Sequence, residues 1–120
     1  DCFLLPADLS EEEACREVVA KAIAGMGGLD ILINNAAYQQ PQDGVEKITR
    51  EQLEHTFRVN LFAMFHLAAA AVDHLKEGSS IINTASVTHY AGSPQLLDYS
   101  STKGAIIAFT RSLSASLVEK

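Results

Sequence analysis

The sequence predicts an α/β protein built on a doubly wound parallel sheet. Short apolar segments of strand length alternate along the chain with longer segments of helical periodicity. The apolar segments show almost no polar alternation, which is typical of parallel strands covered on both faces. Strands that alternate with helices pair in parallel through right-handed crossovers, so we expect one sheet with helices on both sides.

The chain begins with a predicted strand over residues 3–9, a mostly apolar run. Ser10 and Glu13 have the spacing of a capping box, so we expect a helix to begin there. Its apolar periodicity continues to about Ala24, where a glycine follows and is expected to end the helix.

Two more strands and two long helices complete the predicted order. The strands cover residues 29–37 and 80–85. Between them, Thr49 forms a second capping box with the glutamine three residues later and begins a helix that runs to about Glu77. A final helix is expected over residues 96–118.

Composition limits the classes of function. A chain of 120 residues with 48% hydrophobic residues forms one domain with a real core, and its net charge of −6 argues against a nucleic-acid partner. No apolar run reaches the roughly 20 residues of a membrane span, and no basic-then-apolar leader opens the sequence, so we expect a cytoplasmic protein. Its two cysteines and four histidines fall at no metal-ligand spacing, and we expect no metal site.

Polar residues follow each predicted strand, where ligands bind in sheets of this kind. Asp8 closes the first strand, Asn34 and Asn35 the second, and Ser86 the third. We therefore expect these side chains to gather at one crevice, with Asn34 joining the strands and Asn35 facing a ligand.

Tyr99 and Lys103 lie four residues apart and share one face of the last predicted helix. A tyrosine is a weak base at neutral pH unless a nearby cation favours its phenolate. Alone, such a pair is more typical of a solvated helix edge, so its meaning depends on the surrounding motifs.

Those motifs resemble the short-chain dehydrogenase/reductase family, in order and over essentially the whole chain. They are Tyr99-Ser-Ser-Thr-Lys103-Gly104-Ala105 for the YxxxK signature, Ser86 at the family's spacing before the tyrosine, Asn34-Asn35-Ala36-Ala37 for NNAG, Asn60 for the helix asparagine, and Asp8-Leu9 for the acidic position near the adenine. Ala37 departs from the family pattern, which has glycine there. The occurrence of these motifs in order on the expected elements makes this resemblance specific.

The resemblance implies an oxidoreductase that interconverts an alcohol and a carbonyl by hydride transfer, with NAD or NADP as cofactor. The implied catalytic residues are Asn60, Ser86, Tyr99 and Lys103. Tyr99 is the acid/base, Ser86 and Tyr99 hold the substrate oxygen, Lys103 holds the nicotinamide ribose, and Asn60 holds a water that joins Lys103 to solvent. The implied cofactor-binding residues are Asp8, Leu9, Asn35, Ala36, Tyr99 and Lys103.

The family's glycine-rich phosphate loop does not occur in this sequence. Residues 1–120 are therefore expected to be the central part of a single NAD(P)-binding Rossmann-type domain, with strands three to five of the order 3-2-1-4-5-6. We expect a longer protein to contain them, and the isolated residues to be inactive.

Two alternatives to an enzyme of this family stay open. A non-catalytic remnant of the fold, acting only in helix-mediated assembly, has no reason to keep Asn60, Ser86, Tyr99 and Lys103 together. A serine hydrolase is disfavoured because Ser86 lies in Thr-Ala-Ser-Val-Thr and not in a GxSxG elbow.

Apolar and small residues extend around both long helices, beyond one core-facing stripe. Residues assigned to outer faces include Phe62, Ala63, Ala69, Ala105 and Ala108. We expect a homodimer, or a homotetramer, built on residues 50–77 and 96–118, which is also how this family usually assembles.

Overall fold

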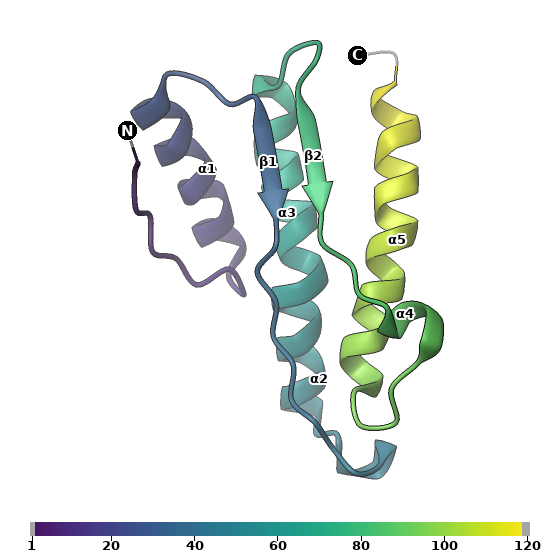
Figure 1. Ribbon diagram of the computed structural model, residues 1–120. Coiled ribbons are helices and arrows are strands. Elements are labelled where there is room, and N and C mark those ends of the chain that lie inside the picture. Colours follow the sequence, from purple (N-terminus) through teal and green to yellow (C-terminus); the bar gives the residue numbers. More distant parts are fainter. Residues whose placement is uncertain (1, 119–120) are drawn as a thin grey trace.

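The computed structural model describes residues 2–118 and contains two parallel strands beside a set of helices (Figure 1). In β1 and β2, Ile31 lies opposite Ser80 and Asn34 opposite Asn83. This arrangement confirms a partial α/β fold. The elements are α1 (Glu12–Met26), β1 (Ile31–Asn34), the 3-10 turn η1 (Val45–Lys47), α2 (Arg50–Phe57), the π turn η2 (Arg58–Phe62), α3 (Ala63–Ala71), the 3-10 turn η3 (Val72–His74), β2 (Ser80–Asn83), α4 (Thr88–Ala91) and α5 (Leu97–Leu117).

The predicted strand over residues 3–9 is wrong. This segment makes no strand ladder, and in Figure 1 it runs along the outer side of α1, away from β1. A strand needs a neighbour to accept and donate its backbone hydrogen bonds. No strand lies beside this segment among residues 2–118, so an apolar run of the right length stays irregular.

The predicted capping box of α1 is also wrong. Glu11 is the N-cap residue and makes no side-chain bond to the helix. The Ser10 hydroxyl and backbone N–H instead both donate to one Asp8 carboxylate oxygen, at 2.7 and 3.0 Å. Because the Ser10 hydroxyl is bonded within this local turn, it does not cap the helix. At its other end α1 passes the predicted stop and closes at Gly27, whose φ of 82° suits glycine.

The capping by Thr49 is confirmed, because its hydroxyl oxygen accepts from the backbone N–H of Gln52 at 3.1 Å. The helix that follows is not uniform, since the π turn η2 separates α2 from α3. A π turn inserts an extra residue and rotates what comes after it. Ala63, which we assigned to an outer face, is consequently buried, whereas Phe62 remains half exposed.

The apolar core lies between α1 and α3. It contains Cys15, Val19, Ala63, Leu67 and Ala71, all buried. These residues are small or medium in size, which lets the two helices approach closely.

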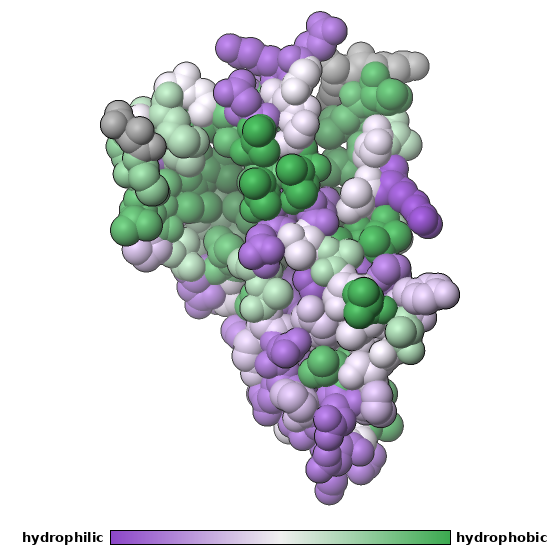
Figure 2. Space-filling view, in the orientation of Figure 1, coloured by the Kyte–Doolittle hydropathy of each residue, from purple (hydrophilic) through white to green (hydrophobic). Residues whose placement is uncertain are grey.

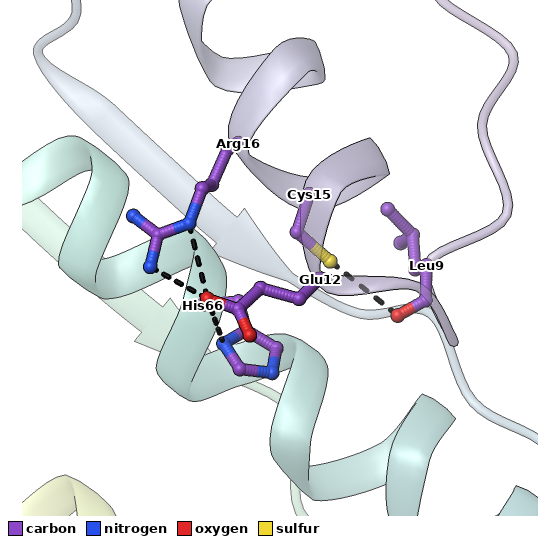
Figure 3. Close-up of polar contacts among 5 residues, drawn as sticks. All are labelled: Leu9, Glu12, Cys15, Arg16 and His66. Carbon is purple, nitrogen blue, oxygen red and sulfur yellow. Dashed lines mark hydrogen bonds and ion pairs between the residues drawn. The ribbon is translucent and has the colours of Figure 1, made fainter.

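Polar contacts border this core at the junction of α1 and α3 (Figure 3). The Cys15 thiol donates to the Leu9 carbonyl oxygen at 3.4 Å, and burial raises the pKa of Cys15. Glu12 accepts from Arg16 at 2.6 Å, and His66 lies 3.9 Å from the same carboxylate oxygen. Cys15 is therefore a protonated, structural thiol, while the exposed Glu12–Arg16 pair adds little stability.

The sheet is covered on one face only. The helices pack behind the strands in Figure 1, whereas Ile31, Ile33 and Ile82 on the front face are 50–60% exposed. Figure 2 shows the resulting hydrophobic patch over β1 and β2. The expectation of two covered faces is thus wrong for residues 2–118, because their helices gather on the same side.

Strand and helix bounds differ modestly from the predicted ones. β1 and β2 both end at an asparagine, earlier than predicted, while α5 lies within one residue of the expected range at each end. The short helix α4 was not predicted. Within residues 2–118, no helix combines the length and the apolar character that crossing a membrane requires.

Candidate active site

Tyr99 and Lys103 lie on α5, one turn apart and facing the carboxyl end of β2. The Lys103 side chain is 1% exposed, and its Nζ lies 5.4 Å from the centroid of the Tyr99 ring. Nζ donates to the Thr84 carbonyl oxygen at 2.9 Å. Burial lowers the pKa of Lys103, because it disfavours the charged ammonium. This is a buried cation beside a half-buried phenol, and not a solvated helix edge.

Ser86 follows β2 by three residues, at the entry to α4. Its Oγ accepts from the Thr88 backbone N–H at 3.3 Å and from the Thr88 hydroxyl at 3.1 Å. A hydroxyl has two acceptor sites and one proton. With both acceptor sites used by Thr88, the Ser86 proton is left to donate to another oxygen.

Asn60 lies in the π turn and is fully buried. Its Oδ1 accepts from the Tyr38 N–H at 2.7 Å, and its Nδ2 donates to the Tyr38 carbonyl at 2.8 Å and to the Thr102 hydroxyl at 3.1 Å. Thr102 directly precedes Lys103. The Asn60 side chain thus joins the loop after β1 to the turn of α5 that carries Tyr99 and Lys103, and both of its N–H donors and its oxygen are bonded to protein.

The asparagines after β1 have different surroundings. Asn34 is buried, and its Nδ2 donates to Asn83 Oδ1 at 2.8 Å, so it joins the two strands as expected. Asn35 is exposed, and its Oδ1 accepts from the Thr84 hydroxyl at 3.0 Å. The Thr84 carbonyl oxygen also accepts from Lys103, so Asn35 and Lys103 are bonded to the same residue. Ala36 and Ala37, which follow, are exposed.

Asp8 is not gathered with these residues by any hydrogen bond. Its carboxylate accepts from Ser10, and these bonds hold the pKa of Asp8 below its usual range. Leu9 is partly buried against the core. Hydrogen bonds therefore join the ends of β1 and β2 and one face of α5 in the predicted crevice, whereas none of them reaches Asp8 among residues 2–118.

Three threonines of this site were not predicted from the sequence. Thr84 supplies the carbonyl that holds Lys103, Thr88 orients Ser86, and Thr102 receives Asn60. Thr84 and Thr88 flank Ser86 at two residues on either side, and this clustering of hydroxyls at a strand end was a usable signal. Thr102 lies in no such cluster at a strand end, and a single threonine within a predicted helix does not indicate a site.

Comparison with known proteins decides the family. The sequence model described as short chain dehydrogenase matches residues 1–120. The chain belongs to this family. Among its short-chain dehydrogenase relatives, the uncharacterized oxidoreductase YhdF of Bacillus subtilis is 53% identical over 119 residues, and the glucose and ribitol dehydrogenase of Daucus carota is 48% identical over 120 residues. The chain covers 41% of the length of each of these proteins, and the matches cover 99% and 100% of the chain.

A solved short-chain dehydrogenase from Burkholderia cenocepacia, in complex with NADP, has a similar fold. Its TM-score is 0.89 at 31% identity, and the match covers 94% of this chain and 46% of that one. The Rossmann-type fold expected from the sequence is therefore confirmed at the level of this partial domain.

Proposed function

We propose that the complete protein containing residues 1–120 is an NAD(P)-dependent oxidoreductase that interconverts an alcohol and a carbonyl, with Tyr99 as the acid/base. One observation carries the proposal: a nearly fully buried ammonium, that of Lys103, lies beside the Tyr99 ring at the end of a parallel strand. Membership of the short-chain dehydrogenase family supports oxidoreduction in general.

The Lys103 ammonium fits the ribose of a nicotinamide cofactor. Of its three N–H donors, one is used by the Thr84 carbonyl, and a buried donor without a partner costs free energy. Because no other acceptor in residues 2–118 bonds Nζ, two donors are left for oxygen acceptors such as ribose hydroxyls. Asn35 and Ala36 are exposed at the adjoining end of β1, where they can contact the same cofactor. Asp8 and Leu9 lie outside this cluster, and their proposed place near the adenine rests on the family pattern.

The bound nicotinamide would supply hydride transfer, and this chain would supply the proton. Tyr99 exchanges a proton with the substrate oxygen, and the nearby Lys103 ammonium favours negative charge on the phenol when the proton leaves. Ser86 donates its free proton to the same substrate oxygen and fixes it beside Tyr99. The Asn60 side chain holds the loop and α5 in place. That Asn60 also holds a water for proton exchange rests on the family pattern, because its side-chain groups are already bonded to protein.

The test is Tyr99→Phe in the complete protein, measured by NAD(P)H absorbance with ribitol, glucose and simple aldehydes as substrate probes. We expect turnover to fall roughly 100-fold or more, because acid/base catalysis is lost, while NADPH still binds. Tyr90→Phe is the matched control, since Tyr90 is 88% exposed. Near-normal turnover in Tyr99→Phe would remove Tyr99 from the mechanism and favour a non-catalytic role for the fold.

We further propose that a second copy of the chain packs on α3 and α5. Between these helices lies a groove with a largely apolar lining: Leu61, Phe65, Ala105, Ala108, Phe109, Ser112, Leu113 and Ser116. Phe62 and Phe65 beside it are about half exposed. The groove is what the proposed homodimer would bury.

Residues 1–120 alone are expected to show no dehydrogenase activity. Pyrophosphate binding in this family depends on a glycine-rich loop at a helix N-terminus, and the sequence has none. NAD(P)H formation by the isolated 120 residues with any alcohol, measured at 340 nm, would contradict this expectation.

A further inference from the structure

The residue before Tyr99 is a buried acid. Asp98 lies in the first turn of α5 and is 3% exposed. Its Oδ2 accepts from the Thr56 hydroxyl at 2.8 Å and from Gln52 Nε2 at 3.1 Å, both on α2. Its Oδ1 is buried without a hydrogen-bond partner among residues 2–118. A buried carboxyl with one unpartnered oxygen costs free energy, so packing alone does not account for it.

Gln52 extends this contact to the loop after β1. The same Nε2 donates to the Gln40 carbonyl oxygen at 3.0 Å, and Gln52 Oε1 accepts from Gln42 Nε2 at 2.7 Å. Gln52 is itself buried. A single side chain therefore bonds two positions of the loop and the carboxyl that precedes Tyr99.

A second set of bonds joins the same loop to the segment before α5. The Gln42 N–H donates to the Gln95 carbonyl oxygen at 2.9 Å, and Gln95 Nε2 donates to Asp43 Oδ1 at 3.0 Å. Asn60 in η2 also holds Tyr38 through both of its backbone groups. Residues 38–43 are therefore bonded to three other segments: α2, η2 and the residues just before α5.

We propose that Asp98 is a positioning residue, which through Gln52 and Thr56 fixes the loop of residues 38–43 relative to Tyr99. This role rests on the proposed function of Tyr99. The loop leaves β1 at the proposed cofactor-binding asparagine, so its position determines the space available to a substrate next to the phenol. Removing the carboxyl leaves neither partner unsatisfied, because Thr56 also contacts the Gln52 carbonyl oxygen at 2.8 Å and Gln52 retains Gln40. The substitution instead removes the bonds that fix the loop of residues 38–43 relative to α5.

The experiment compares Asp98→Ala, Asp98→Asn and the control Ser101→Ala in the complete protein. Ser101 is exposed on α5, and within the described part of the chain its hydroxyl bonds only the Leu97 carbonyl of its own helix. Three quantities are measured: kcat and KM with the substrate probe that the wild type turns over best, the dissociation constant of NADPH, and backbone hydrogen exchange of residues 38–43. Activities are normalised to NADPH-binding sites, so that loss of folded protein is not counted.

For Asp98→Ala we expect kcat/KM to fall at least about tenfold, with higher KM and faster exchange over residues 38–43, and NADPH affinity within about twofold. Asp98→Asn keeps an oxygen that accepts both bonds, so it should restore kcat/KM to within about threefold. Ser101→Ala should match the wild type.

Two results would overturn the positioning role. One is unchanged kcat/KM and unchanged exchange in Asp98→Ala, while Tyr99→Phe abolishes turnover. The other is a loss of NADPH affinity as large as the loss of kcat/KM, which indicates general disruption. If Tyr99→Phe retains turnover, the proposed function fails instead, and the exchange of residues 38–43 alone decides whether Asp98 holds the loop.

Discussion

At the scale of single residues, Lys103 shows a conflict between stability and function. Its ammonium is almost fully buried, and burial lowers the pKa of Lys103 from the ordinary value of 10.5. The unfolded chain therefore binds this proton more tightly than the folded one, so the charge at position 103 destabilises the fold at neutral pH. The same charge is what the proposed chemistry needs beside Tyr99.

We expect Lys103→Met to raise the free energy of unfolding at pH 7 by about 1 kcal/mol or less, seen as a melting temperature a few degrees higher. The Thr84 carbonyl that loses its donor belongs to an exposed residue and can be solvated. As pH rises from the folded-state pKa of Lys103 toward 10.5, the wild type gains stability and the difference between the proteins shrinks. Melting curves of both proteins at pH 7 and near pH 10 measure this; a variant that is less stable at pH 7 would contradict it.

The same substitution should damage function. In the complete protein, Lys103→Met is expected to lower both the affinity for NAD(P)H and the turnover, because one side chain serves ribose binding and the charge on Tyr99. Fluorescence titration with NADPH and steady-state rates measure the two effects separately. If the affinity were unchanged, the ribose role would fail while the role beside Tyr99 could stand.

At the scale of elements, the π turn places Asn60 where one side chain can join three segments. The turn lies between α2 and α3, and the Asn60 amide bonds both backbone groups of Tyr38 and the hydroxyl of Thr102. An apolar residue there would leave the Tyr38 N–H and carbonyl in a buried site without partners.

Asn60→Ala is therefore expected to lower the free energy of unfolding by about 2–3 kcal/mol. Asn35→Ala is the matched control, because Asn35 is exposed and makes one side-chain bond, and it should cost roughly 0.5 kcal/mol or less. Urea unfolding of both variants gives the two values. Equal effects of the two substitutions would show that the bonds of Asn60 contribute no more than one exposed bond.

An element could be predicted from the sequence where its hydrogen-bond partners lie close to it in the chain. It could not be predicted where those partners lie far away in the chain. Periodicity and Thr49 were enough to place the long helices but not the short helix α4, since a long helix satisfies most of its own backbone. The segment of residues 3–9 has strand composition, but whether it pairs depends on what lies beside it. The π turn has no sequence signature either. For the site, Tyr99 and Lys103 followed from the YxxxK motif together with the other motifs of the resemblance, whereas the contacts of Thr102 and Asp98 became visible only in the packed structure.

At the scale of the whole molecule, two of the open apolar surfaces of residues 2–118 differ in kind. One is the front of the sheet, with Ile31, Ile33 and Ile82. In a doubly wound fold this face is covered by further helices, so we expect other parts of the complete protein to cover it. The other is the groove between α3 and α5, which lies on the helices and not on the sheet.

The groove has the features of a contact between two copies. Ala105, Ala108 and Ser112 recur along α5 at helical spacing, and such small side chains allow a second helix to approach closely. Phe65 stacks against Phe109 at 4.3 Å between ring centroids and remains half exposed, so an apolar anchor is available beside the small residues. A two-fold axis there would bring α3 and α5 of one protomer onto the same helices of its partner, and both grooves would be buried together.

We therefore expect the complete protein to sediment as a dimer or tetramer, and Ala108→Arg to shift it toward monomer at micromolar concentration. Ala108 is exposed within the groove, and an arginine there would place a charge and a long side chain where two helices must meet. Ala20→Arg makes the same change on an exposed position of α1, away from the groove, and should leave the sedimentation coefficient unchanged. Sedimentation velocity at several concentrations measures both. A wild type that is monomeric throughout, or an Ala108→Arg variant with undiminished assembly, would mean that this groove is covered by other parts of the same protein and not by a second copy.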